Sequence, residues 1–470
     1  MNLETLSLLR FEWALIAIIL VLLVMKLADA DTKVKPMLTA INLILVANFL
    51  LGLLPFADGS LFNNFFRTTS MIVLQKNILN FGVLLISLTA YRYLSNIKNQ
   101  LEYYILLLTS LLGMFVMISS GHILMLYLGL EMSTIPVAAL VNYNRTQRNS
   151  SEAGLKLIFS SAFSTGILLF GISMLYGATG SLDYATVAAN LQVNALTLLS
   201  FAFILAGFAF KMSVVPFHLW TADVYEGAPV SVTSFLSVIS KGSVIFVFVT
   251  ALYSLFGHLQ TEWLYIVSIL AVITMTVGNL FTLRQNNIKR LLAFSSITQV
   301  GFVLVGIAGA SAMGNASVVY FVLIYILSNV AAFGVIGAIS DATGKETLDA
   351  FKGLYKSNPY LAGILALSLF SLAGVPPTAG FFGKLFLLTS GMGNALYTVL
   401  AIASINLVIS LYNYLRVVKT MFMDTAEVEL EKVETNLPLN IALIICAIGL
   451  VVIGFIPAIY DYINSLSVGI

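Results

Sequence analysis

Long apolar stretches separated by short polar ones run along the whole chain. A helix needs about 20 consecutive apolar residues to cross a hydrocarbon core roughly 30 Å thick. Fourteen stretches of about this length can be marked, so the pattern predicts an all-α polytopic membrane protein with fourteen transmembrane helices, numbered one to fourteen. The expected segments are 11–27, 36–56, 70–92, 102–119, 121–141, 153–177, 196–221, 228–256, 262–282, 288–309, 315–340, 359–387, 392–415 and 438–460.

The composition indicates the same class of protein. Of the 470 residues, 59% are apolar and 9% are charged, and the mean hydropathy is +0.99. Soluble globular chains carry about 25% charged residues, so the expected surroundings are the lipid bilayer, and no nucleic acid is expected as a partner. Cys446 is the one cysteine, which excludes an intrachain disulfide and any cysteine-ligated metal or iron–sulfur site.

Basic residues are spread unevenly over the two sets of loops. Sixteen follow odd-numbered helices, whereas the opposite face holds only Arg10, Arg67 and Lys76. By the positive-inside rule the odd loops are cytoplasmic, and because fourteen is even, both termini are expected on the periplasmic side of a bacterial inner membrane. An acidic run before the last helix is expected to be a solvated or partner-facing surface, and it comprises Asp424, Glu427, Glu429, Glu431 and Glu434.

Four of the 23 basic residues remain, and all are lysines inside expected membrane segments: Lys156, Lys211, Lys241 and Lys384. A charge at membrane depth is costly, and such residues usually mark an ion or proton pathway. Glu131 is the one carboxylate clearly placed within a segment. Lys156 is the least secure of the four, because it can pair with Glu152 four residues earlier and can extend toward the interface.

Two of the lysine-bearing segments contain helix breakers at depth. Pro216 follows Lys211 by five residues, and Lys384 is preceded by Pro376, Pro377 and Gly380. Proline removes a backbone donor, and in a membrane the freed groups need partners from protein or water. Broken helices in corresponding halves of a chain are a pointer to an ion path, although a packing kink is the alternative interpretation.

The positions of the breaks also suggest an internal repeat. Helices four to eight and nine to thirteen form two five-helix sets, with the broken members seventh and twelfth. An odd number of helices in each set makes the second copy inverted relative to the first. We therefore expect four regions: an N-terminal three-helix segment (1–100), a first repeat (101–257), a second repeat (258–421) and an acidic connection with the last helix (422–470).

The buried ionisable residues fit proton transfer. Burial disfavours the charged form of lysine, and a nearby carboxylate favours it. A lysine with a movable glutamate partner is therefore a switch, and Glu131 is the expected partner. His218 lies seven residues after Lys211 and is a candidate relay between Lys211 and the next station. The alternative is a buried core histidine.

Four motifs resemble a known family: GLEMSTIP with Glu131, FKMSVVPFHLWTADVYEGAP with Lys211 and His218, SKGSVIF with Lys241, and GVPPTAGFFGK with Lys384. They are similar to the antiporter-like subunits of respiratory complex I, the proton-translocating NADH:quinone oxidoreductase. The family includes Mrp-type cation/proton antiporters and membrane-bound hydrogenases. The resemblance covers helices four to thirteen. It favours the subunit with lysine rather than glutamate at position 384 and no long C-terminal lateral helix.

The resemblance implies a proton pathway with no redox chemistry in this chain. Glu131 matches the fifth-helix glutamate of the family, Lys211 the pump lysine, Lys241 the bridging lysine and Lys384 the terminal lysine. Lys156 and His218 match polar positions of the central axis. NADH, FMN, iron–sulfur clusters and quinone are implied only in partner subunits. The implied partners are neighbouring membrane-arm subunits of the K and M types and the lateral helix of an L-type subunit.

Three other functions stay open from the sequence. An Mrp-type cation/proton antiporter subunit would keep the same lysines. A stand-alone transporter for an organic solute would need a polar cavity, whereas the intramembrane polar residues are mostly Ser and Thr, which also pack helices. A quinone-binding oxidoreductase in its own right would need a cofactor motif, and we find none.

Overall fold

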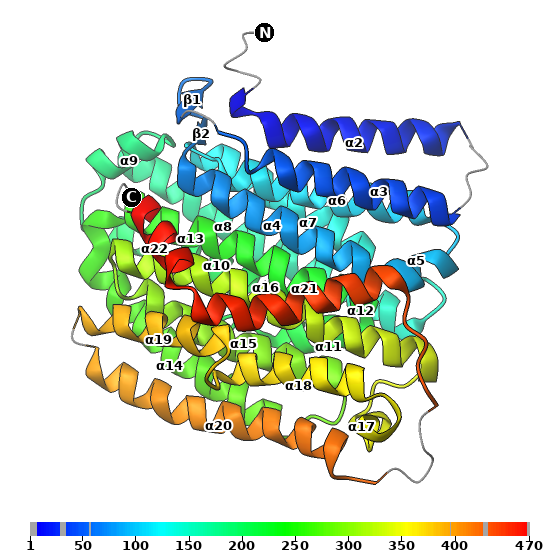
Figure 1. Ribbon diagram of the computed structural model, residues 1–470. Coiled ribbons are helices and arrows are strands. Elements are labelled where there is room, and N and C mark those ends of the chain that lie inside the picture. The colour runs from blue at the N-terminus through cyan, green and yellow to red at the C-terminus, as the bar shows by residue number, and fades with distance from the viewer. Residues whose placement is uncertain (1–6, 29–33, 56–57, 395, 426–430, 468–470) are drawn as a thin grey trace.

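A bundle of roughly parallel and antiparallel helices makes up the protein (Figure 1). The computed structural model describes residues 7–28, 34–55, 58–394, 396–425 and 431–467. Glu427 and Glu429 of the acidic run therefore lie outside the described residues. Because each helix satisfies its own backbone hydrogen bonds, a helical bundle is the form that a chain this apolar takes in lipid. The predicted all-α membrane class is confirmed.

The N-terminal part of the described chain has three long helices, one short helix and a small hairpin. These elements are α2 (Arg10–Leu27), α3 (Val34–Leu51), β1 (Gly59–Leu61), β2 (Phe66–Thr68), α4 (Ser70–Thr89) and α5 (Tyr91–Asn96). The two strands pair antiparallel, with Gly59 opposite Thr68.

The middle of the chain supplies most of the bundle. The first part comprises α6 (Gln100–Ile118), α7 (Ile123–Val141), α8 (Arg148–Thr179), α9 (Tyr184–Asn190), α10 (Ala195–Met212), α11 (Leu219–Gly227), α12 (Val230–Phe235), the π-helix η1 (Leu236–Ser240) and α13 (Lys241–Ser254). The second comprises η2 (Gly257–Leu259), α14 (Gln260–Thr282), α15 (Ile288–Ile307), α16 (Ala312–Thr343), η3 (Leu348–Phe351), α17 (Leu354–Ser357), α18 (Pro359–Ala373), α19 (Ala379–Met392) and α20 (Tyr397–Phe422). The last helices are α21 (Leu437–Phe455) and α22 (Pro457–Leu466).

Twelve of the described helices are long and apolar enough to cross a membrane. The first predicted segment is α2, an 18-residue helix that carries Arg10, Glu12 and Lys26. The predicted segment 359–387 is divided into α18 and α19, of 15 and 14 residues. Each predicted segment thus overlaps one or more helices. The number of fourteen spans remains a prediction. The last predicted segment is too long, because α21 ends at Phe455 before Pro457.

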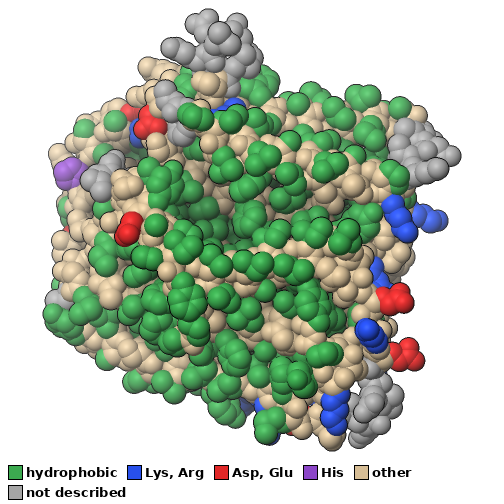
Figure 2. Space-filling view, in the orientation of Figure 1, with side chains coloured by type: hydrophobic (Ala, Val, Ile, Leu, Met, Phe, Trp, Pro, Cys, Tyr) green, Lys and Arg blue, Asp and Glu red, His purple; other side chains and the backbone are tan. Residues whose placement is uncertain are grey.

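Burial separates central helices from peripheral ones. In α15, α16 and the continuous run Val230–Ser254, 94%, 89% and 89% of the spanning stretch is buried. In α3, α20 and α21 the corresponding values are 33%, 33% and 28%. Lys241 lies in one of these central helices, whereas the peripheral helices present apolar side chains outward, as the green surface in Figure 2 shows.

The two ends of the bundle differ in charge. Figure 2 shows most visible Lys and Arg side chains at the end where Figure 1 places α5 and α17. We call this the basic end, and it includes the loop 343–347. The opposite hairpin end carries β1, β2, α9 and α22. Thr68 Oγ1 donates to the Leu8 carbonyl at 3.2 Å, and α22 closes over the start of α16, so both chain ends lie at the hairpin end.

Both predicted helix breaks are present. α10 ends at Met212, where Ser213 has φ 65°, and α11 begins at Leu219. α18 ends at Ala373, where Gly374 has φ 84°, a conformation that favours glycine. The structure adds a third irregularity that the sequence did not predict, the π-helix that directly precedes Lys241. π-Helical turns often occur at functional sites.

Candidate functional site

Lys211 lies one residue before the end of α10 and points at hydroxyl groups. Its Nζ donates to Thr134 Oγ1 of α7 and to Ser161 Oγ of α8, both at 2.7 Å. Near the break, the Phe210 carbonyl accepts a hydrogen bond from Trp220 Nε1 at 3.0 Å and does not bind Lys211. Hydroxyls can donate or accept, so they can pass a proton to or from the amine.

Glu131 lies on α7, one helical turn before Thr134. It interacts electrostatically with Lys211, but among the described residues the two do not form an ion pair. One of its carboxylate oxygens is buried and has no hydrogen-bond partner among these residues. Thr134 therefore stands between the predicted partners. α7 is held in register against α6 by Gly113 and Gly129, where any Cβ would meet the opposite backbone at under 3 Å.

Lys241 is buried at the centre of the bundle, with 1% of the residue exposed. Its Nζ donates to Ser296 Oγ of α15 at 2.7 Å and lies 5.2 Å from the centre of the Tyr225 ring. His218 caps the start of α11 and is near enough to Lys241 for an electrostatic interaction. The Nδ1 atom of His218 is buried and makes no hydrogen bond within the described structure. His218 thus lies in the neighbourhood of Lys241 and is hydrogen-bonded to the backbone at Pro216.

Lys384 uses the second helix break directly. Its Nζ donates to the carbonyls of Leu372 at 2.6 Å and Ala373 at 3.3 Å, the last residues of α18. A Cβ added to Gly374 would lie 3.1 Å from the Lys384 side chain, so glycine makes room for the lysine. The ammonium also lies 4.7 Å from the centre of the Phe302 ring.

A polar row on α15 connects the surroundings of Lys241 with those of Lys384. Ser296 binds Lys241, and Gln299, one turn further along α15, donates to the same Leu372 carbonyl at 3.1 Å. Gln299 also donates to Tyr414 Oη of α20 at 2.9 Å. Two polar residues one turn apart on α15 therefore lie at Lys241 and at the carbonyl that binds Lys384. Sequence reasoning missed Ser296 and Gln299, although their three-residue spacing is a helical signal.

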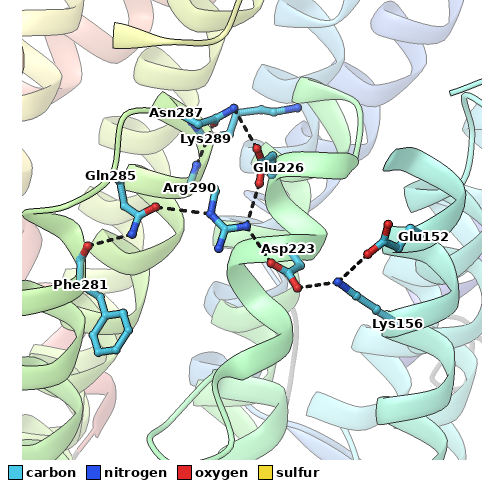
Figure 3. A network of polar contacts seen from close by, with 9 residues as sticks. All are labelled: Glu152, Lys156, Asp223, Glu226, Phe281, Gln285, Asn287, Lys289 and Arg290. Carbon is cyan, nitrogen blue, oxygen red and sulfur yellow. Dashed lines mark hydrogen bonds and ion pairs between the residues drawn. The ribbon is translucent and has the colours of Figure 1, made fainter. Parts of the chain in front are cut away.

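Lys156 is not buried: 44% of its side chain is exposed. Its Nζ lies 2.7 Å from Glu152 and 2.7 Å from Asp223 of α11 (Figure 3). The predicted pair with Glu152 is confirmed, and the secondary role of Lys156 in the proton path remains a prediction. Burial raises the pKa of the Asp223 carboxyl, but hydrogen bonds from Lys156 and Arg290 outweigh it and hold the pKa below its ordinary value.

Two buried ionisable residues were missed in the N-terminal helices. Lys76, expected at a membrane face, is 1% exposed and pairs with Glu12 of α2 at 2.5 Å. Glu12 is 5% exposed, so Glu131 is not the one carboxylate within a helix segment. Phe66 of β2 and Phe115 of α6 place their ring centres 4.8 Å and 5.7 Å from the Lys76 ammonium. No sequence signal joins positions 64 residues apart.

A large hollow opens at the basic end, with a volume of about 1880 Å³. Polar side chains of α11, α12 and α15 line it, including Glu226, Ser231, Ser234 and Lys289. Ser234 is 2% exposed and its Oγ has no hydrogen-bond partner among the described residues. It lies seven residues, about two turns, before Lys241 on the same run of helix. The hollow thus leads toward the central lysine.

The described residues can also be searched for a metal site. Within the described ranges, no group of three or more His, Cys, Asp or Glu residues is placed to hold a metal ion. Cys446 is a free, buried thiol. The printed partners of the three buried lysines are hydroxyls and backbone carbonyls.

Comparison with known proteins gives a consistent result. The profile of the family described as "NADH:quinone oxidoreductase/Mrp antiporter, TM" matches residues 120–410. The chain is 45% identical over 417 residues to NADH-quinone oxidoreductase subunit N of Azobacteroides pseudotrichonymphae genomovar. CFP2, which covers 88% of this chain and 87% of that protein.

Solved structures share the fold. A chain of respiratory complex I from Thermus thermophilus with bound aureothin has a TM-score of 0.80 and 26% identity, covering 95% of this chain and 97% of that one. A chain of the Mrp complex from Dietzia sp. DQ12-45-1b has a TM-score of 0.87 and 20% identity, covering 100% and 97%. The fold alone does not separate the two kinds of complex, but the sequence identity does. The chain belongs to the NADH:quinone oxidoreductase/Mrp antiporter membrane family and, within it, to the N subunits of NADH-quinone oxidoreductase.

Proposed function

We propose that this membrane-arm subunit carries protons along an axis formed by Glu131, Lys211, Lys241 and Lys384. The observation that supports the proposal best is the polar link across α15, where Ser296 binds Lys241 and Gln299 shares the Leu372 carbonyl with Lys384. Burying polar groups inside the most buried helix of the bundle costs free energy, so such groups usually have a function. Proton transfer is the function that accounts for them here.

The steps follow from the contacts. When Glu131 approaches Lys211, it replaces Thr134 as the partner of the ammonium and holds the proton there. When Glu131 withdraws, the proton passes by His218 to Lys241. From Lys241 it passes by the Ser296 hydroxyl toward Lys384, the terminal station, and Gln299, whose amide carries no proton, holds the Leu372 carbonyl that binds Lys384. Moving one charge against 100 mV requires about 2.3 kcal/mol, which the rearrangement of such a pair can supply.

Protons reach this axis from the basic end. The hollow there brings water to Ser234, and Ser237 and Lys241 follow on the same helix. The π-helix widens the turn between them, which leaves backbone carbonyls less tightly paired than in an α-helix. We assign the basic end to the cytoplasmic side, with both termini periplasmic, and retain the four predicted regions and the two inverted repeats as the organisation of the chain.

The chain contributes to the enzyme complex without a redox centre of its own. NADH, FMN, iron–sulfur clusters and quinone would be held by other subunits, and neighbouring subunits of the K and M types and an L-type lateral helix would contact this one. The redox energy would reach Glu131 as a change in the charge of adjacent groups.

Gln299→Leu tests the link across α15. It removes the hydrogen bonds to the Leu372 carbonyl and Tyr414 while keeping the volume. A lost hydrogen bond is worth about 0.5–1.5 kcal/mol, so the proton-pumping rate of the assembled complex in proteoliposomes should fall roughly threefold to tenfold. Gln192→Leu, at an exposed position near the hairpin end, is the control. Unaltered pumping in Gln299→Leu would contradict the pathway.

Cysteine labelling tests the orientation. In a Cys446→Ala background, Lys345→Cys places a thiol in an exposed loop at the basic end, and a membrane-impermeant maleimide should label it only from the cytoplasmic side. Val193→Cys, 55% exposed at the hairpin end, should be labelled only from the periplasm. The reverse pattern would show that the assigned sides are wrong.

A further inference from the structure

The short helix α11 has contacts of two kinds on its two sides. Toward the axis, the Tyr225 ring lies 5.2 Å from the Lys241 ammonium, and His218 at the helix start is near enough to the same lysine for an electrostatic interaction. Toward the basic end, Asp223 and Glu226, three residues apart, point at α8 and α15 (Figure 3). One nine-residue helix therefore joins the proton axis to a group of surface charges.

Arg290 is the centre of that group of charges. Its Nη1 atom lies 2.7 Å from Asp223 Oδ1 and 2.8 Å from Glu226 Oε2, so one guanidinium binds carboxylates on two successive turns of α11. Asp223 is shared, because its other oxygen accepts from Lys156 Nζ at 2.7 Å. Lys289, the neighbour of Arg290, donates to the Ala228 carbonyl just beyond α11 at 2.9 Å.

α11 is not continuous with the helix before it or the helix after it. It is separated from α10 by the break at 213–218 and from α12 by Ala228 and Pro229. On the axis side, Thr221 Oγ1 donates to Ser213 Oγ at 2.7 Å. A short helix between two irregular segments depends on side-chain contacts for its position, and the ion pairs to Arg290 are charged contacts that reach it from α15.

We propose that Arg290 is a positioning residue for proton transfer: through Asp223 and Glu226 it sets the position of α11, and thereby holds His218 and Tyr225 against Lys241. Lys156 takes part in this clamp as the second partner of Asp223, which gives it a role away from the path itself. The proposal rests on the proposed proton axis and adds Arg290, which neither the motifs nor the axis include.

Hydrogen–deuterium exchange and pumping, measured on the same assembled complex, test the proposal. Arg290→Gln should increase amide exchange in the peptide 219–227 and lower proton pumping roughly threefold to tenfold. Arg290→Lys should restore part of both, because a single ammonium holds one carboxylate better than two. Arg284→Gln, which removes an exposed guanidinium at the same end, should change neither.

A double variant shows whether Arg290 acts through α11. If it does, Arg290→Gln combined with His218→Gln should lose less pumping than the product of the two single losses. If the pumping loss of the double variant equals the product of the two single losses, the proposal is overturned. Unchanged amide exchange of residues 219–227 in Arg290→Gln would overturn it as well. Normal pumping in His218→Gln would overturn the role of His218 in the axis, whereas faster exchange in Arg290→Gln would still support the clamp.

Discussion

Lys211→Ala is expected to abolish most coupled proton pumping by the assembled complex. The lysine is the station between Glu131 and the rest of the axis, and its two hydroxyl partners, Thr134 and Ser161, do not replace a group that binds a proton. Positioned acid–base groups accelerate proton transfer by about 10²–10⁴-fold, so the pumping rate should fall by a factor of this order. Quinone reduction should slow with it where the two are coupled.

Lys211→Arg separates proton transfer from fixed charge. Arginine keeps the charge and can still donate to Thr134 and Ser161, but it does not release its proton in proteins. Pumping should therefore stay low in Lys211→Arg, while the complex assembles normally. Lys356→Ala, exposed at the basic end, is the control for loss of a lysine. Normal pumping in either Lys211 variant would refute the assigned role.

The burial of Lys241 and Lys384 could be predicted from sequence because each leaves a local signal. Lys241 stands in a long apolar run, and Lys384 follows Pro376 and Pro377, so charge counting and proline chemistry suffice to find them. Their partners are different. The Leu372 carbonyl that binds Lys384 is an ordinary backbone group, and only the helix break at Gly374 exposes it.

Contacts between distant segments could not be predicted in this way. Arg290 looks like a helix-end residue of a cytoplasmic loop, and its link to Asp223 depends on how α11 packs against α15. The spacing of four residues predicts the pair of Lys156 with Glu152, but no local signal points to the second partner of Lys156, Asp223 of α11. Periodicity locates helices, whereas pairing requires the three-dimensional arrangement.

The buried pair of Glu12 and Lys76 should have the largest effect on stability. Lys76→Met alone leaves a carboxylate 5% exposed without its cation, and Glu12→Gln alone leaves a buried ammonium between Phe66 and Phe115. Breaking a buried ion pair from one side costs about 3–5 kcal/mol. Each single variant should therefore lower the temperature at which this subunit unfolds within the purified complex, as followed by thermal denaturation.

The double variant Glu12→Gln/Lys76→Met distinguishes a paired charge from simple packing. With both charges gone, no ion is left without a partner, and replacement of buried pairs by neutral groups is often neutral or stabilising. The double variant should hence recover most of the stability lost in either single one. Lys26 is also on α2 and forms an exposed pair with Glu102 of α6. Lys26→Met should therefore lower the free energy of unfolding by no more than about 1 kcal/mol. If the double variant is less stable than both single variants, the two residues stabilise the N-terminal helices through separate contacts rather than as a pair.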